Sequence, residues 1–164
     1  MIKYLVGLLC LALLPGWLTY IDKTYNYSID YPQDWAKKSL GGLIAFLSPK
    51  DGPNDNFPEN VNVLIQDLSD HPMTLDQYTE LTRNQITQNY GDSAIISMQP
   101  ATVAGQNAEV AIYNFKYQSR ALKIKQYWFV KTQKAFIVTY TAVPDQFTRY
   151  DSTATRVMNS FRFN

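Results

Sequence analysis

The fold of this chain is decided by residues 106–142, QNAEVAIYNFKYQSRALKIKQYWFVKTQKAFIVTYTA. This segment contains three runs rich in β-branched and aromatic residues, at 106–117, 121–131 and 135–142. Residues of these types favour extended strands. The short polar stretches 118–120 and 132–134 separate the runs. Because turns this short join antiparallel neighbours, the segment predicts a meander of three long strands.

Shorter strands are predicted on the N-terminal side of this meander, at 28–31, 42–47, 60–67 and 93–98. In the run from 60 to 67, the apolar residues Val61, Val63 and Ile65 alternate with the amides Asn62 and Gln66. Alternation with a period of two places these two sets on opposite faces of a sheet. Residues 49–60 are rich in Pro, Gly, Asn and Asp, which predicts a long exposed loop.

Two amphipathic helices complete the set of predicted elements. Thr74 and Gln77 form a capping-box pattern at the start of the first helix, which ends near Tyr90. Pro144 opens the second helix, in which apolar residues recur at helical spacing as far as Phe161. Several strands carry apolar residues on both faces. The elements therefore predict an α+β fold, an α/β/α sandwich in which helices cover a mainly antiparallel sheet of six to seven strands.

The first residues of the chain indicate export. Lys3 precedes an uninterrupted apolar run from Tyr4 to Leu14, which has the length of a secretory signal core and is shorter than a membrane span. We predict a signal segment at residues 1–19 and a single domain at residues 20–164, located in the periplasm, in a lumen or outside the cell. An uncleaved segment would tether the domain to the membrane. Cys10 lies in the apolar run, but Leu9 stands where a lipid-attachment motif takes a small residue.

The composition excludes several functions. Cys10 is the only cysteine, so the exported domain has no thiol for a disulfide, a nucleophile or a metal site. Without Lys3 the 15 Lys and Arg become 14, against 14 Asp and Glu, and this balance gives no general attraction to nucleic acid. His71 is the only histidine and no G-x-S-x-G motif is present, so no catalytic residues are predicted. A hydrolase that uses Asp or Glu is kept as a third alternative.

Several short motifs, taken in order, resemble the PsbP-like family. They are YSIDYP at 27–32 followed by Trp35, FLSP at 46–49, NVNV at 60–63, the helix start at Thr74, the strand around Trp128, YTA at 140–142 and SF at 160–161. The resemblance covers residues 20–163 and implies an α/β/α sandwich around an antiparallel sheet. It also implies a non-enzymatic role, such as stabilising a membrane complex, helping it retain calcium, chloride or manganese, or assisting its assembly.

A metal site is the first candidate for binding. Acidic residues and the one histidine concentrate in the polar stretch 51–76, at Asp51, Asp55, Glu59, Asp67, Asp70, His71 and Asp76. Oxygen-rich ligands suit calcium or manganese, although the spacing does not match an EF-hand. We predict Asp67, Asp70 and His71 as the metal ligands. The alternative is a polar loop in which the acids only maintain solubility.

A docking surface is the second candidate. Along 121–131, one face of the predicted strand carries Lys123, Lys125, Tyr127, Phe129 and Lys131. Lysines that flank aromatic residues suit a protein partner or an anionic head group. The alternative is that a helix covers the aromatic residues while the lysines reach solvent at its margin.

The function predicted from these observations is that of an exported, non-enzymatic accessory domain, which docks on or stabilises a membrane or envelope protein complex. The alternative is a protein that binds a divalent ion or a small ligand through the acidic loop 51–76. Pro32, Pro53 and Pro58 would blunt the edges of the sheet, which predicts a monomer.

Overall fold

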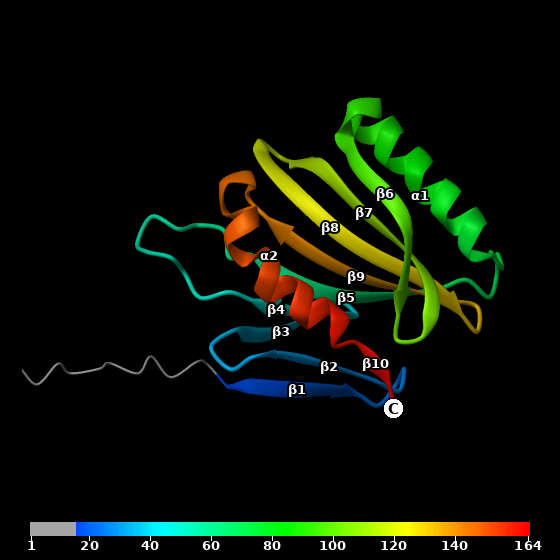
Figure 1. Cartoon of the computed structure of the whole chain (residues 1–164), viewed down its shortest axis with the longest axis horizontal. Helices are drawn as coiled ribbons and strands as arrows, with labels where there is room; N and C mark the ends of the chain where they lie inside the picture. Colours follow the sequence, from blue (N-terminus) through cyan, green and yellow to red (C-terminus); the bar gives the residue numbers. More distant parts are fainter. Residues whose placement is uncertain (1–15) are drawn as a thin grey trace, which may run out of the picture.

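The computed structural model describes residues 16–164, so the export and lipidation predictions that rest on residues 1–15 lie outside the described residues. Within this part of the chain, two antiparallel sheets and two α-helices form a layered α+β structure (Figure 1). Among the described residues, no helix is long and apolar enough to cross a bilayer. The predicted α+β class is confirmed.

The larger sheet has seven strands, and each strand is antiparallel to its neighbours. In spatial order they are β3 (Ala36–Leu40), β4 (Leu43–Leu47), β5 (Asn60–Asp67), β9 (Lys134–Ala142), β8 (Arg120–Lys131), β7 (Gln106–Tyr117) and β6 (Ile95–Val103). The smaller sheet contains β1 (Trp17–Asp22), β2 (Tyr27–Pro32) and β10 (Arg162–Phe163). The helices are α1 (Leu75–Tyr90) and α2 (Pro144–Asn159), with a short 3-10 turn at Asp92–Ala94.

The predicted meander is present as β7, β8 and β9, and its turns set the register. Thr132 and Gln133 connect β8 to β9 with φ values of 50° and 55°, which is the left-handed backbone that a tight hairpin turn needs. This turn places Lys131 opposite Lys134 and, further along, Trp128 opposite Ile137. Since a shift of one residue would invert every side chain, this register decides which residues face each layer.

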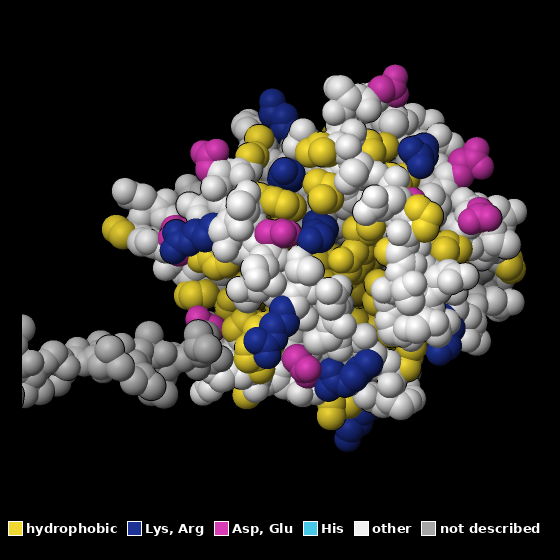
Figure 2. All heavy atoms as spheres, in the orientation of Figure 1, with side chains coloured by type: hydrophobic (Ala, Val, Ile, Leu, Met, Phe, Trp, Pro, Cys, Tyr) yellow, Lys and Arg dark blue, Asp and Glu magenta, His cyan; other side chains and the backbone are white. Residues whose placement is uncertain are grey.

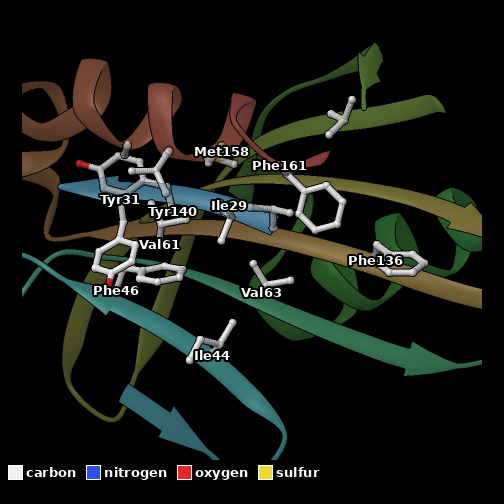
Figure 3. Close-up of a cluster of buried hydrophobic side chains, with 14 of the residues drawn as sticks. Ile29, Tyr31, Ile44, Phe46, Val61, Val63, Phe136, Tyr140, Met158 and Phe161 are labelled. Atoms are coloured by element: carbon white, nitrogen blue, oxygen red, sulfur yellow. The ribbon is translucent and has the colours of Figure 1, made fainter. Parts of the chain in front are cut away.

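One face of the large sheet is covered by α2 together with the small sheet (Figures 1 and 3). Tyr31 of β2 stacks on Phe46 of β4, with ring centroids 4.5 Å apart. Near the C-terminus, Phe161 stacks on Tyr27 of β2 at 4.8 Å. The Tyr140 hydroxyl of β9 donates a hydrogen bond of 2.8 Å to the backbone carbonyl of Phe147 in α2. The first and last segments of the domain therefore share one core.

The opposite face is covered by α1, which packs on β7 and β8. The capping box predicted at Thr74 and Gln77 is present and starts this helix. Tyr78 and Ile86 of α1 are buried against Trp128 of β8, and the Trp128 indole N–H donates a hydrogen bond of 2.9 Å to Thr79 Oγ1. The layers therefore have the predicted α/β/α order, and a small sheet shares the α2 layer.

Three strands were not predicted from the sequence. β1 begins at Trp17, so residues 17–19, which the sequence analysis assigned to the signal segment, pair with residues 30–32 of β2. β3 carries Lys37 and Lys38 at the edge of the large sheet, where lysines protect an open edge but weaken the apolar pattern of a strand. β10 contains two residues, which is too short for a periodic signal.

Replacing Phe46 by alanine tests the core on the α2 side. Phe46 is fully buried, and removal of its ring leaves a cavity between β2 and β4. We expect Phe46→Ala to lower the free energy of unfolding by about 3–5 kcal/mol, measured by urea denaturation. Leu64, which is 40% exposed on β5, provides the control, and Leu64→Ala should cost less than about 1 kcal/mol. Equal losses in the two variants would contradict this description of the core.

Candidate functional site

The docking face predicted on β8 lies inside the structure. Phe129 is fully buried and stacks on Phe136 at 5.2 Å. Lys125 Nζ donates hydrogen bonds to Asp151 Oδ1 at 3.1 Å and to Thr155 Oγ1 at 2.7 Å, both on α2. These contacts occupy the face that was expected to receive a partner.

The other residues of this predicted face also contact the covering layer. Tyr127 is half-buried against the same core. Lys123 Nζ lies 4.6 Å from the ring centroid of Phe147, and Lys131 Nζ lies 3.7 Å from that of Phe163. The prediction of a docking surface is therefore corrected, because α2 and the C-terminal strand cover the aromatic residues. The structure has the alternative arrangement, in which a helix covers the aromatic residues and the lysines lie at the margin of the covered face.

The predicted metal ligands Asp67, Asp70 and His71 do not converge. Asp67 Oδ1 accepts hydrogen bonds from the hydroxyl and the backbone N–H of Ser69, at 2.6 and 2.8 Å. These bonds, with help from Lys134, hold the pKa of Asp67 below its ordinary value. Asp70 and His71 are exposed. Among the described residues, the acids whose oxygens lie within 4.8 Å of one another are Asp51, Asp55 and Glu59.

The open surface of the large sheet lies on its α1 side. α1 packs mainly on β7 and β8, and among the described residues it reaches β5 through the hydrogen bond between Tyr78 and Gln66. A groove of about 500 Å³ lies here, lined by α1 on one side and by residues of β5, β7, β8 and β9 on the other. The residues of β5 that line it are Asn62, Leu64 and Gln66, which alternate with the buried Val61 and Val63.

The side chains that line the groove include no Asp, Glu, Lys, Arg or His. Five of them are amides, at Asn62, Gln66, Gln85, Asn89 and Gln126. An amide side chain can donate and accept hydrogen bonds at the same time. The groove therefore offers polar groups of both kinds without any net charge.

Aromatic side chains form the floor of the groove and fix some of its amides. Tyr78 donates a hydrogen bond of 3.0 Å to Gln66 Oε1, and Gln126 Nε2 donates one of 2.8 Å to Thr139 Oγ1. Burial raises the pKa of Tyr113 to about 12 and also raises that of Tyr78, so both phenols stay neutral at physiological pH. The side chain of Gln85 has no hydrogen-bond partner among the described residues, which leaves it available to a ligand.

The rim of the groove carries exposed apolar side chains. Leu64 on β5 is 40% exposed and Tyr90 at the end of α1 is 38% exposed. On the α2 face, by contrast, acidic and basic side chains are interspersed with apolar ones and form no patch of one sign (Figure 2). The uncharged groove is thus a distinct surface of the molecule.

The sequence contained one signal of this groove. Asn62 and Gln66 were assigned to the face of β5 opposite the core, which the structure confirms. Leu64 lies between them on that polar face, and an exposed leucine in this position indicates a contact surface. The width of the uncovered area could not be predicted, because it depends on which strands α1 covers.

Fold and groove together define an α+β domain with an open groove on one face of its sheet. A family model described as PsbP-like protein matches residues 16–163. The match spans nearly all of the described chain, so the chain belongs to the PsbP-like family, as its motifs predicted. A search of curated protein sequences finds no match.

Solved structures share this fold at low sequence identity. The solution structure of cyanobacterial PsbP (CyanoP) from Synechocystis sp. PCC 6803 has a TM-score of 0.64 and 14% identity, covering 94% of this chain and 96% of that chain. Protein PA94 from Pseudomonas aeruginosa has a TM-score of 0.61 and 15% identity, with coverages of 88% and 94%. LpqN from Mycobacterium tuberculosis, which is involved in cell envelope biogenesis, has a TM-score of 0.55 and 12% identity, with coverages of 93% and 87%.

The corrected role of Lys125 can be tested by replacing it with methionine. Its ammonium joins β8 to α2, so Lys125→Met should lower the free energy of unfolding by about 1 kcal/mol in urea denaturation, since the partly exposed Asp151 weakens the pair. Lys116 on β7 is exposed and has no ion pair among the described residues, so Lys116→Met is the matched control and should leave stability unchanged. A Lys125 variant as stable as this control would contradict a structural role.

Proposed function

We propose that this protein is an exported, non-enzymatic accessory domain that docks on a protein of the membrane or cell envelope through the groove beside α1. The observation that carries the proposal is the groove itself, an uncharged surface of about 500 Å³ with an apolar rim on the open face of the sheet. Its size is in the range of pockets that hold a ligand or a short chain segment.

The occupant is an extended, uncharged segment of a partner protein. A charged side chain of the partner would be buried without an opposite charge, because no ionisable Asp, Glu, Lys, Arg or His lines the groove. Backbone amides of a peptide, in contrast, find matching groups in Asn62, Gln66 and Gln85. Here the hydrogen bonds to the peptide main chain would come from amide side chains, with apolar side chains alongside.

The exposed rim favours a protein over a neutral glycan. Leu64 is aliphatic and presents exposed apolar surface that a sugar would not match. Trp128 and Tyr113 in the floor are buried, so Tyr90 at the rim is the exposed aromatic side chain of the lining. Aromatic and aliphatic side chains together, with few charges, characterise the centres of protein interfaces.

Family membership and the N-terminal sequence also support this proposal. LpqN, which shares the fold, is involved in cell envelope biogenesis, and the first residues of this chain have the pattern of an export signal. The groove has no carboxylate, histidine or lysine to serve as an acid or base. The acids that could serve a hydrolase are Asp51, Asp55 and Glu59, but hydrogen bonds within the protein already hold Asp51 and Asp55.

Photocrosslinking from the groove tests the proposal. A photoreactive amino acid replaces Leu64 in the full-length protein, and irradiation is carried out in cells of the native host. We expect one envelope or membrane protein to be captured, and mass spectrometry should map the crosslink to a segment without charged side chains. The same amino acid at Ile21, which is 58% exposed on β1 of the small sheet, is the control and should not capture that protein.

A second variant separates docking from chance proximity. Leu64→Arg places a charge in the groove and should reduce recovery of the captured protein by about tenfold or more, while Ile21→Arg should leave it unchanged. Equal capture from positions 64 and 21, or a crosslink to a highly charged segment, would refute the proposed occupant. Binding of peptidoglycan fragments to the groove, with no protein captured, would replace the protein partner by a glycan.

A further inference from the structure

The loop between β4 and β5 lies beside the start of α2 (Figure 1). Together they form a second pocket, which shares no lining residue with the groove. Asp51, Asp55 and Glu59 each offer a carboxylate oxygen here, and these oxygens lie within 4.8 Å of one another. Val143 and Gln146, from the first turn of α2, complete the lining of a pocket of about 470 Å³. Three acids from one loop therefore face the same space.

Glu59 is the unusual member of this cluster. Its side chain is 1% exposed, and its Oε1 atom has no hydrogen-bond partner among the described residues. A buried carboxylate oxygen without a partner is costly, so such groups normally take up a proton or pair with a cation. Burial, together with the nearby Asp55 and Asp51 carboxylates, raises the pKa of Glu59 although backbone hydrogen bonds oppose this effect.

Asp51 and Asp55 are already held in place. Asp55 Oδ1 accepts a hydrogen bond of 3.0 Å from the Phe57 N–H, and its Oδ2 accepts one of 3.0 Å from the Asp51 N–H. These backbone bonds lower the pKa of Asp55, so it is ionised at neutral pH. Asp51 Oδ1 accepts a hydrogen bond of 2.8 Å from the Tyr150 hydroxyl and lies 2.9 Å from Arg149 Nη2, both on α2.

We propose that Asp51, Asp55 and Glu59 bind a divalent cation that prefers oxygen ligands, with calcium as the representative ion. A cation at this position would give the orphaned Glu59 oxygen the partner that the protein does not supply. The three ligands are all carboxylates, which suits calcium, magnesium or manganese rather than zinc or copper. A loop that contains Gly52 and Pro53 can add backbone carbonyls, which are also ligands of calcium.

Arg149 is the resident counter-charge of this pocket. Its guanidinium pairs with Asp51, but the side chain is 59% exposed and can move into solvent. An incoming cation would compete with Arg149 for the Asp51 carboxylate. Through Asp51 and Tyr150, the bound ion would also join the loop to α2. This site shares no residue with the groove on the α1 side.

Calorimetric titration of the EDTA-treated protein with calcium chloride tests this inference. We expect saturable one-site binding by the wild-type protein, and a loss of affinity of about tenfold or more in Glu59→Gln and in Asp55→Asn. Asp67→Asn is the matched control, because Asp67 is an exposed aspartate at the end of β5, outside the cluster, and it should bind as the wild type does. Parallel titrations with magnesium and manganese chloride establish which ion the pocket prefers.

Two further measurements keep the result interpretable. In EDTA, Glu59→Gln should unfold cooperatively at a temperature no lower than that of the wild type, which shows that lost binding is not lost folding. Arg149→Gln should bind calcium more tightly than the wild type, because the competing guanidinium is gone. Absence of binding of all three ions to the wild type, or equal losses in Glu59→Gln and Asp67→Asn, would overturn the site.

Discussion

Both faces of β8 must be buried at once, and the architecture follows from this constraint. Trp128 and Phe129 are neighbours in the sequence, point to opposite faces and are both fully buried. Each face therefore needs its own covering layer, but a helix about 10 Å wide covers only about two strands spaced about 4.8 Å apart. On one face the small sheet extends the cover that α2 begins. On the other face α1 packs mainly on β7 and β8, and the groove opens between α1 and the exposed side chains of β5.

The strands and helices with a clear period could be predicted from the sequence, as could the family. The meander β7 to β9, the alternation in β5 and the capping box of α1 rest on neighbouring residues, so local patterns were sufficient. The docking face was chosen wrongly because lysines beside aromatic residues have two meanings, an exposed patch or the margin of a covered one. Lys125 could be assigned to the margin of a covered face only from its contacts with Asp151 and Thr155, which are 26 and 30 residues away in the sequence.

The residues of the acidic pocket could not be predicted from local sequence patterns either. The sequence indicated that acids concentrate between residues 51 and 76, yet spacing alone could not tell which of them meet. The loop between β4 and β5 turns back so that Asp51 reaches Tyr150, which is 99 residues further along the chain. Asp67 instead closes a local turn with Ser69 and remains exposed. Convergence of this kind depends on how α2 packs, which periodicity does not describe.

The contact between Phe161 and Tyr27 has a consequence for the order of events in biosynthesis. The core on the α2 side takes side chains from β2, near the start of the domain, and from Met158 and Phe161, near its end. Until the ribosome has added these last residues, the early strands have no complete surface to pack on, and long-range contacts of this kind form late. In a chain built in this way, the core on the α2 side can be completed only after the last residues have been synthesised.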